Sequence, residues 1–496
     1  MAYNTNTQLT ELAKSQEKRF IKSLARTDIT LFIVAAIISL DTIATIATGG
    51  AQSLFWAVVV AFTFLIPISM LMAETGSAFP EEGGLYNWVK FAYGRLAAGI
   101  ASVLYWITNP LWLGGSLCFI AFDAFSGYII EVKAGSAGEW LFKLAFIWIA
   151  IYLAVINLKL GKQFIGAGAI AKVFVISSLV ITTAIYGIKN GFQPFDFAGL
   201  SPTLGGFIAI APVILFSYVG FEAPNAASGE MFDAKKDTAP AIRRGSAIAT
   251  LAYLLPVLAI ILIVPNDELE GLSGFLGAVN EVYSVYGGAA EFLVAVTAAL
   301  FIFGLLSLGS AWMMATDRIQ AIASADGAFF SGWFGQFSEK YGTPVRVNIL
   351  SGFMSTAFLI AAMTIVEGDA ASIFTVVLVC AISTLLVSYT IILPSVMKLN
   401  RTRRDVVRPY QVPGGVRGFQ ILGSILFIYI CIGSIGVVFP GTLEGIFGLE
   451  YDFQEIWGMA RADVQLFTAG TMLVVIIIAI AGYAGGKKVR AGITNK

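Results

Sequence analysis

Long apolar stretches recur along the whole chain and are separated by short polar connections. Twelve of them approach the ~20 residues that an α-helix needs to cross a lipid bilayer. Because unpaired backbone groups are not tolerated in hydrocarbon, each stretch is expected to be a helix. The pattern predicts an all-α polytopic membrane protein with 12 transmembrane helices, over residues 29–48, 54–73, 97–127, 140–157, 164–187, 206–228, 246–265, 289–314, 348–366, 371–395, 419–439 and 465–484.

Basic residues are concentrated on alternate connections. If the N-terminus is cytoplasmic, all but five of the 31 lysines and arginines fall on the inner side, the exceptions being Lys133, Lys143, Lys172, Lys189 and Arg461. Loops that are rich in Lys and Arg stay in the cytoplasm. The sequence therefore predicts a multi-pass protein of the cell inner (cytoplasmic) membrane, with a cytoplasmic N-terminal segment (1–28) and a cytoplasmic tail (485–496).

Composition supports a membrane protein and excludes several other classes. The chain is 57% hydrophobic and only 12% charged, with a mean hydropathy of +0.82, so the lipid bilayer is its expected surrounding. Acidic and basic residues balance at 31 each, which gives no indication of a nucleic-acid partner. Histidine is absent and the three cysteines lie in apolar stretches. We therefore expect no metal site, no cofactor, no catalytic residues and no enzyme.

Two of the predicted spans are interrupted by polar residues and glycine. The first contains Ser39 to Thr42, and the sixth contains Tyr218 to Asn225. These positions are equivalent if residues 29–187 and 206–395 are two five-helix repeats, followed by two additional helices in 419–484. Because five is odd, the repeats would have opposite topology, and broken helices in inverted repeats indicate a binding site near the membrane midplane. An ordinary proline or glycine kink is the alternative for either span.

Four ionisable residues lie well inside the predicted spans: Asp41, Asp123, Lys172 and Glu222. A charge in the bilayer costs roughly 2.5–3.5 kcal/mol even on a lenient scale, so each is a functional candidate. Asp41 and Glu222 are predicted to bind a substrate ammonium group or to take up a coupling proton. Lys172 either extends to the interface or acts as a buried coupling cation. Asp123 fits an entrance better than a central ligand.

Polar and aromatic residues beside the two interruptions complete the predicted site. We expect substrate-binding roles for Ser39, Thr42, Asn109, Tyr218, Gly220 and Phe221 together with Asp41 and Glu222, and gate or cavity roles for Trp106, Trp112, Asp123 and Ser307. Most aromatic residues in a helix bundle only pack or anchor it at the interface. Ser307 also has an alternative role, since small residues allow close helix contact.

Several short motifs occur in a fixed order: Glu74–Pro80, Gly83–Val89, Gly220–Glu222, Ser228–Glu230, Asp317–Arg318, Ala325–Gly327, Tyr341–Pro344 and Arg408–Gly415. With these motifs the chain resembles the amino acid-polyamine-organocation superfamily of transporters, bacterial amino acid permease type, from about residue 28 to 490. The resemblance implies a LeuT-like 5+5 inverted repeat plus two C-terminal helices, alternating access, and a substrate held between spans 1, 3, 6, 8 and 10. It also implies that Lys172 stands where sodium-dependent relatives bind an ion.

The chain departs from this superfamily at the first break. Many members have a small, glycine-rich segment there that holds a substrate carboxylate, whereas this chain has Asp41. An anionic side chain would repel a carboxylate unless it were protonated or paired. This departure favours a polyamine-like amine as substrate, or a proton-coupling role for Asp41.

The sequence thus predicts a secondary active transporter that moves an amino acid or an organic amine across the cytoplasmic membrane. Proton coupling is expected rather than sodium coupling, through Asp41, Glu222 and Lys172. One alternative is an exchanger that swaps a precursor for its decarboxylated product. A membrane solute sensor is an alternative from a different class.

Overall fold

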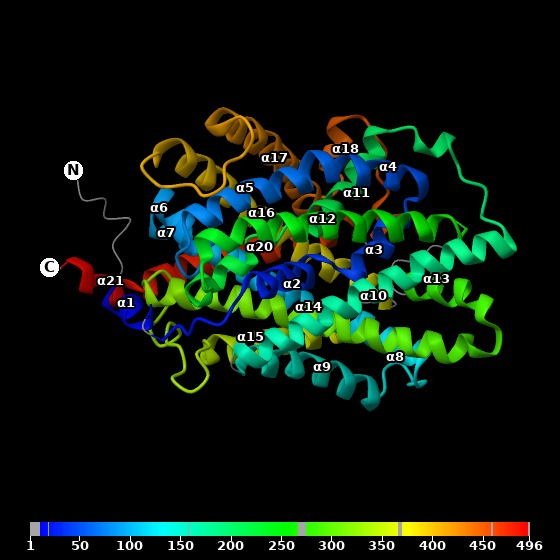
Figure 1. Cartoon of the computed structure of the whole chain (residues 1–496), viewed down its shortest axis with the longest axis horizontal. Coiled ribbons are helices and arrows are strands. Elements are labelled where there is room, and N and C mark those ends of the chain that lie inside the picture. The colour runs from blue at the N-terminus through cyan, green and yellow to red at the C-terminus, as the bar shows by residue number, and fades with distance from the viewer. Residues whose placement is uncertain are drawn as a thin grey trace.

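Every regular element in the described part of the chain is a helix (Figure 1). The computed structural model describes residues 10–17, 19–156, 158–265, 274–365, 370–457 and 460–494. Within these ranges the only β-type pairing is an isolated parallel bridge between Leu24 and Met231. The all-α fold predicted from the apolar stretches is therefore confirmed.

Ten helices in the described residues are long and apolar enough to cross a membrane, and a bent pair can be counted as an eleventh span. The bent pair is α2 (Arg26–Ile37) with α3 (Leu40–Ala47), and the shorter apolar helix α11 (Leu204–Ser217) occupies the sixth predicted span. The remaining spans are α4–α5 (Gly50–Ala78), α7–α8 (Arg95–Tyr128), α9 (Ala137–Val155), α10 (Leu158–Asn190), α12 (Ala234–Ile261), α14 (Ala290–Ala325), α15 (Val345–Ile365), α16 (Ala370–Thr402), α17 (Gly415–Val438) and α20 (Arg461–Gly485).

The eighth span is longer than the hydropathy pattern predicts. The apolar stretch ends at residue 314, but α14 continues to Ala325 through Asp317, Arg318 and Gln320. All three of these polar side chains are buried. Helix α14 can extend because the surrounding bundle supplies partners for its polar groups, which hydropathy does not record.

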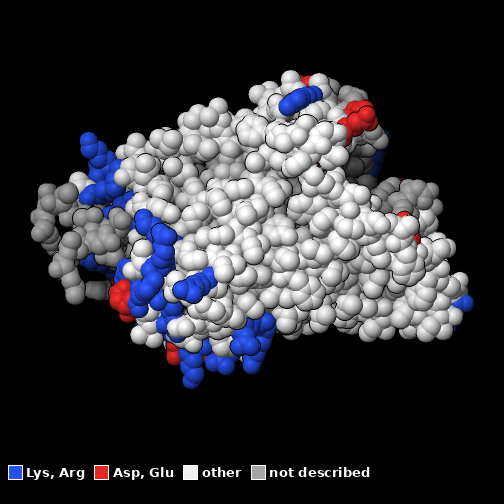
Figure 2. Space-filling model, turned by 90° about the horizontal axis from the view of Figure 1, so that it is seen from above, with Lys and Arg blue, Asp and Glu red and all other residues white. Residues whose placement is uncertain are grey.

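One end of the molecule is basic. Figure 2 shows lysine and arginine side chains gathered at the end that carries the short helices α1 (Glu11–Glu17), α6 (Leu85–Tyr93) and α21 (Lys487–Thr494). We call this the basic end. Residues from the N-terminal segment pack against this end. The amide of Thr10 donates to Asp326, and the amide of Ser23 donates to the Glu230 carbonyl.

Buried ion pairs hold the basic end together, and they are made by the motifs noted in the sequence. Arg408 lies 3.1 Å from Glu74, and Arg318 lies 2.7 Å from Glu230. Asp326 is shared by Lys90 at 2.7 Å and by a second cation, Arg95. Burial lowers the pKa of Lys90, although the Asp326 carboxylate opposes this shift. The ion pairs tie α5, α6, α14 and the α16–α17 connection into one closed face.

Candidate substrate site

The first span is broken between α2 and α3. Ile38 and Ser39 have extended backbone conformations, and the two helix axes differ by 44°. Breaking a helix frees carbonyl groups that need new donors. Here these donors are side chains: the Tyr253 hydroxyl donates to the Ile37 carbonyl at 2.6 Å, and the Trp312 indole donates to the Ala36 carbonyl at 2.7 Å.

Lys172 supplies the charged donor at this break. Its side chain on α10 is fully buried, and Nζ donates to the carbonyls of Ala35 and Ile38, both at 2.7 Å. The structure thus places Lys172 inside the bundle and not at the membrane interface. An ammonium group held by the free carbonyls of an unwound segment occupies the kind of position in which a metal cation would be coordinated.

Asp41 lies in the first turn of α3, directly after the break. The Ser39 hydroxyl donates to one of its carboxylate oxygens, and the Trp112 indole donates to the other at 3.0 Å. The carboxylate is buried and its hydrogen-bond donors are neutral. Thr42, one residue further, accepts a hydrogen bond from the Ser217 hydroxyl of α11 at 2.9 Å, which joins the two interrupted spans.

The sixth span stops being α-helical at Ser217. Gly220 has φ of +111°, a conformation that few other residues adopt, and a Cβ there would lie 2.9 Å from the Trp312 ring. Beyond this turn, the hydroxyls of Tyr105 and Tyr389 both donate to Oε1 of Glu222 at 2.6 Å. Oε2 of Glu222 is buried without a hydrogen-bond partner. A buried carboxylate oxygen that lacks a donor retains capacity for a ligand.

Aromatic rings lie between the two breaks. Trp112 packs edge-on against Phe216 at 5.0 Å and against Trp312 at 6.3 Å, and Trp312 lies 5.6 Å from Tyr105. An aromatic surface flanked by carboxylates can bind an organic cation through its ring faces as well as through charge. Asp41, Glu222 and these rings form one buried cluster, which we call the central site.

Three residues of this neighbourhood escaped the sequence analysis: Trp312, Tyr389 and Tyr253. Each lies in an apolar stretch where an aromatic residue is ordinary, so its type alone gives no functional signal. Tyr389 belongs to none of the sequence motifs, and only its hydrogen bonds to Glu222 and Gly220 identify it.

Three other predicted residues are buried in the bundle, and in the described part of the chain their side chains make no hydrogen bond to either carboxylate of the central site. Trp106 donates to Asp317 and Ser351, on the side of the basic end. Tyr218 is fully buried and donates to the Ala57 carbonyl of α4. Phe221 is likewise completely buried.

Asn109 donates to the Gly309 carbonyl at 3.3 Å, while its own Oδ1 is buried without a partner. Ser307 donates to the Ile165 carbonyl, and a Cβ on Gly168 would collide with it. Ser307 therefore serves the close contact of α10 with α14. Asp123 is half-buried near the end of α8 (Cys118–Tyr128), apart from both breaks.

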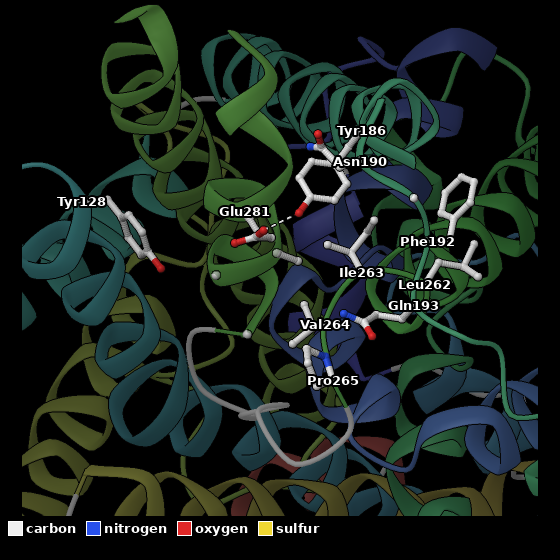
Figure 3. A pocket seen from close by; sticks show the side chains of 14 residues that line it. Tyr128, Tyr186, Asn190, Phe192, Gln193, Leu262, Ile263, Val264, Pro265 and Glu281 are labelled. Atoms are coloured by element: carbon white, nitrogen blue, oxygen red, sulfur yellow. Dashed lines mark hydrogen bonds between the residues drawn. The ribbon is translucent and has the colours of Figure 1, made fainter. Parts of the chain in front are cut away.

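A pocket of about 570 Å³ opens at the end of the molecule opposite the basic end (Figure 3). Its walls include Tyr128, Tyr186, Asn190 and Glu281, and the Tyr186 hydroxyl donates to Glu281 at 2.6 Å. Glu281 belongs to α13 (Gly274–Tyr283), which packs beside α3. Helix α13 thus joins the wall of the pocket to the helix that follows the first break.

The sequence model of the family described as Amino acid permease matches residues 24–446. The chain therefore belongs to the amino acid permease family, whose members are membrane transporters. This confirms the resemblance inferred from the motifs at Glu74, Gly220, Asp317 and Arg408.

Curated relatives share this family character along most of their length. The chain is 28% identical to an uncharacterized transporter of Legionella pneumophila over 82% of this chain and 87% of the relative. It is 24% identical to the "Probable agmatine/putrescine antiporter AguD" of Lactococcus lactis, covering 90% and 92%. It is also 24% identical to the "Branched-chain amino acid permease BcaP" of Bacillus subtilis, covering 86% and 91%.

The fold is shared with a solved transporter. The crystal structure of the Eremococcus coleocola manganese transporter, in complex with an aromatic bis-isothiourea substituted compound, aligns with a TM-score of 0.59 at 12% sequence identity. The alignment covers 98% of this chain and 99% of that one. At this identity the likeness concerns the fold alone.

Proposed function

We propose that the chain is a secondary transporter for an organic amine, which binds in the central site and is carried without being chemically changed. The observation that carries the proposal is the presence of two buried carboxylates, Asp41 and Glu222, each held by neutral donors. A buried carboxylate is stabilised by an opposite charge, and a substrate ammonium group would supply it. The unpaired Oε2 of Glu222 is available for such a contact.

One of the relatives supports an amine substrate, and another an amino acid. One is described as an agmatine/putrescine antiporter and another as a branched-chain amino acid permease. Agmatine and putrescine are cationic at both ends, which fits a site with two carboxylates. An α-amino acid would bring its own carboxylate towards Asp41, and the two anions would repel each other.

Lys172 is the proposed coupling group. Its ammonium fills the carbonyl cage at the first break that a sodium ion would need, so coupling to protons is favoured over coupling to sodium. Loss of the Lys172 proton would remove the positive charge from the Ala35 and Ile38 carbonyls, weaken both hydrogen bonds and so change how α2 meets α3. In this way protonation and the angle of the first break would be linked.

The proposed transport cycle is alternating access about the two breaks. The ion pairs of Arg318, Arg408 and Lys90 close the basic end, while the opposite end holds the pocket beside Glu281. We assign the basic end and both termini to the cytoplasm of the cell inner membrane, because Lys-rich and Arg-rich segments remain inside. Residues 29–187 and 206–395 are the proposed inverted repeats.

Exchange of two amines is the second candidate. The observation that favours it is the similarity to an agmatine/putrescine antiporter over 90% of the chain. An exchanger would show counterflow between internal and external amine and little net uptake into empty vesicles. A proton-coupled importer would show net uptake driven by an inward proton gradient.

Uptake into proteoliposomes tests the proposal. Purified protein is reconstituted, and entry of radiolabelled putrescine, agmatine and leucine is measured with either buffer or unlabelled amine inside. We expect amine entry that falls at least tenfold in Asp41→Asn, since loss of one charge-assisted contact costs roughly 1.5–3 kcal/mol. Asp123→Asn is the control, because Asp123 lies 11 residues beyond Trp112 on the same span, or roughly 16 Å along the helix, near the end of α8. Leucine uptake that survives Asp41→Asn would contradict the proposal.

A further inference from the structure

A second pocket, of about 470 Å³, lies at the basic end between the start of α12 and the connection that follows α16. It is separate from the central site. Its walls are Asp233, Lys235, Lys236, Ala239, Pro240, Arg243, Pro409 and Tyr410. Three cations therefore face one carboxylate, and the pocket has an excess of positive charge.

The cations of this pocket form no ion pair within the described residues, although Glu81 in the connection between α5 and α6 interacts electrostatically with Lys235. Within the described residues, no carboxylate lies within ion-pair distance of Lys235, Lys236 or Arg243. Asp233 already accepts a hydrogen bond from the amide of Lys236 at 3.1 Å. Asp237 on the same helix is paired with Arg26 at 2.7 Å. The positive charge is therefore available to an anion from outside the chain.

The position of the pocket along α12 places it at a membrane surface. Helix α12 has 28 residues, which at about 1.5 Å per residue make it longer than the ~30 Å hydrocarbon core. If its last ~20 residues cross the core, Arg243 lies at the boundary between hydrocarbon and headgroups, and Lys235 and Lys236 lie just beyond it.

An exposed apolar stripe begins where the cations end. Ile248, Leu251 and Leu255 are 37%, 58% and 42% exposed, and their spacing puts them on one face of α12, in line with Arg244. Exposed aliphatic side chains at this depth face lipid chains. The stripe lies on the face of α12 that adjoins Arg243, about one residue position (roughly 100°) round the helix from it. The acyl chains of a lipid whose headgroup is held at Arg243 would have to cross to this adjoining face to reach the stripe.

Tyr410 adds a neutral donor to the pocket wall. It is half-buried, and burial raises the pKa of its phenol, although the neighbouring Arg243 opposes the shift. The hydroxyl therefore keeps its proton and can donate a hydrogen bond. A phosphate oxygen accepts from hydroxyl, ammonium and guanidinium groups alike.

We propose that this pocket binds one anionic phospholipid, whose phosphate group contacts Lys235, Lys236 and Arg243 while its acyl chains follow Ile248, Leu251 and Leu255. The shared chemistry is that of a phosphate monoanion, and the apolar stripe favours a lipid over free phosphate. Because α12 packs against both halves of the broken first span, α2 and α3, the bound lipid would contact the moving part of the protein through one helix.

Native mass spectrometry of the full-length protein in detergent tests the site. Dioleoyl phosphatidylglycerol, dioleoyl phosphatidylcholine and inorganic phosphate are titrated separately, and the affinity for the first bound molecule is compared. The test variant is Lys235→Gln/Lys236→Gln/Arg243→Gln. The matched control is Lys340→Gln/Lys487→Gln/Lys488→Gln, which removes the same charge from exposed positions elsewhere at the basic end.

We expect the test variant to bind the first phosphatidylglycerol roughly 100-fold more weakly, since each basic residue contributes about a fivefold gain near an anionic lipid. The control variant should bind it like the wild type. Equal affinity for phosphatidylcholine, or a loss of the same size in the control variant, would overturn the proposal. Binding of inorganic phosphate as tight as that of the phospholipid would overturn the assignment to a lipid. A melting temperature close to the wild-type value will show that the test variant is folded.

Discussion

Carboxylates are buried both in the central site and at the basic end, but they have different partners. At the basic end, Glu74, Glu230 and Asp326 each lie within 3.1 Å of an arginine or lysine nitrogen. In the central site, Asp41 and Glu222 are held by hydroxyl and indole groups, and no ion pair reaches them within the described residues. The first set is already neutralised, whereas the second leaves room for a cation that comes and goes.

This difference distinguishes charges that stabilise the fold from charges that are expected to bind the substrate. A buried ion pair that loses one partner is strongly destabilised, because the remaining charge is uncompensated. Asp41 and Glu222 form no ion pair within the described residues, although Lys172 interacts electrostatically with Asp41. Removing either carboxylate charge should therefore affect ligand binding more than folding. Substitutions in the two regions are therefore expected to change different measured quantities.

The largest effect on stability is expected from Arg318→Met at the basic end. Arg318 lies between Glu230 at 2.7 Å and Glu82 at 3.7 Å, and all three side chains are buried. Its removal should reduce the free energy of unfolding by about 3–5 kcal/mol, seen as a much lower melting temperature in detergent. Arg403→Met, which breaks an exposed pair with Asp405, is the control and should change little. Equal melting temperatures for the two variants would contradict the distinction between regions.

Lys172→Met should have the next largest effect on stability and a decisive effect on coupling. It leaves the Ala35 and Ile38 carbonyls without their donor, which we expect to cost about 2 kcal/mol of stability. Transport should also lose its dependence on external pH. Lys162→Met is the matched control on the same helix, since Lys162 pairs with Asp28 in a half-buried position. A proton-driven uptake that persists in Lys172→Met would assign coupling to another group.

Two tyrosines that donate to Glu222 are expected to contribute different amounts to stability. Tyr389 donates to Glu222 and accepts from the amide of Gly220, whereas Tyr105 only donates to Glu222. Tyr389→Phe should therefore cost about 2 kcal/mol of stability and Tyr105→Phe about 1 kcal/mol, by loss of two and one hydrogen bonds. Thermal melts of the two variants measure the difference. The reverse order would show that the Gly220 turn does not depend on Tyr389.

Glu82 is a buried carboxyl group of the basic end whose protonated form is favoured. Its substitution is expected to change stability least. It lies in the connection between α5 and α6, where burial and then the nearby Glu230 raise the pKa of its carboxyl well above the usual value, outweighing Arg318. A raised pKa means that the folded state favours the protonated carboxyl. Stability from this group is greatest below the unfolded pKa of ~4.3 and falls as pH rises from there through the folded pKa.

Glu82→Gln should remove that part of the pH dependence. The variant is expected to melt at a slightly higher temperature than the wild type near neutral pH and at the same temperature near pH 4. Exposed Glu339→Gln provides the control. A variant that is less stable than the wild type at neutral pH would show that Glu82 acts mainly as a partner of Arg318.

The sequence predicted where the spans and their two breaks lie along the chain. It did not predict the direction in which each side chain points within the bundle. Apolar length located the spans, and glycine and polar residues located both breaks with Asp41 and Glu222. Hydropathy does not say which way a side chain points. Trp106 and Trp112 are six residues apart on one span, and at 3.6 residues per turn they face different directions, Trp106 towards Asp317 and Trp112 towards Asp41.

The sequence did not predict hydrogen bonds between residues of distant spans. Tyr389 and Glu222 are 167 positions apart, and Trp312 reaches the Ala36 carbonyl across 276 positions. No local pattern encodes such contacts. The choice between an interfacial and a buried Lys172 was open for the same reason, because it depended on whether a neighbouring helix exposed free carbonyls at that depth.

Binding of an amine to the purified protein tests whether Asp41 is the partner of a substrate ammonium group. Melting temperatures are recorded with putrescine, agmatine and leucine for the wild type, Asp41→Asn and Asp123→Asn; a ligand at 100 times its dissociation constant adds roughly 2.7 kcal/mol of stability. We expect an amine to stabilise the wild type and Asp123→Asn but not Asp41→Asn. Stabilisation by leucine alone, unchanged in Asp41→Asn, would contradict this expectation.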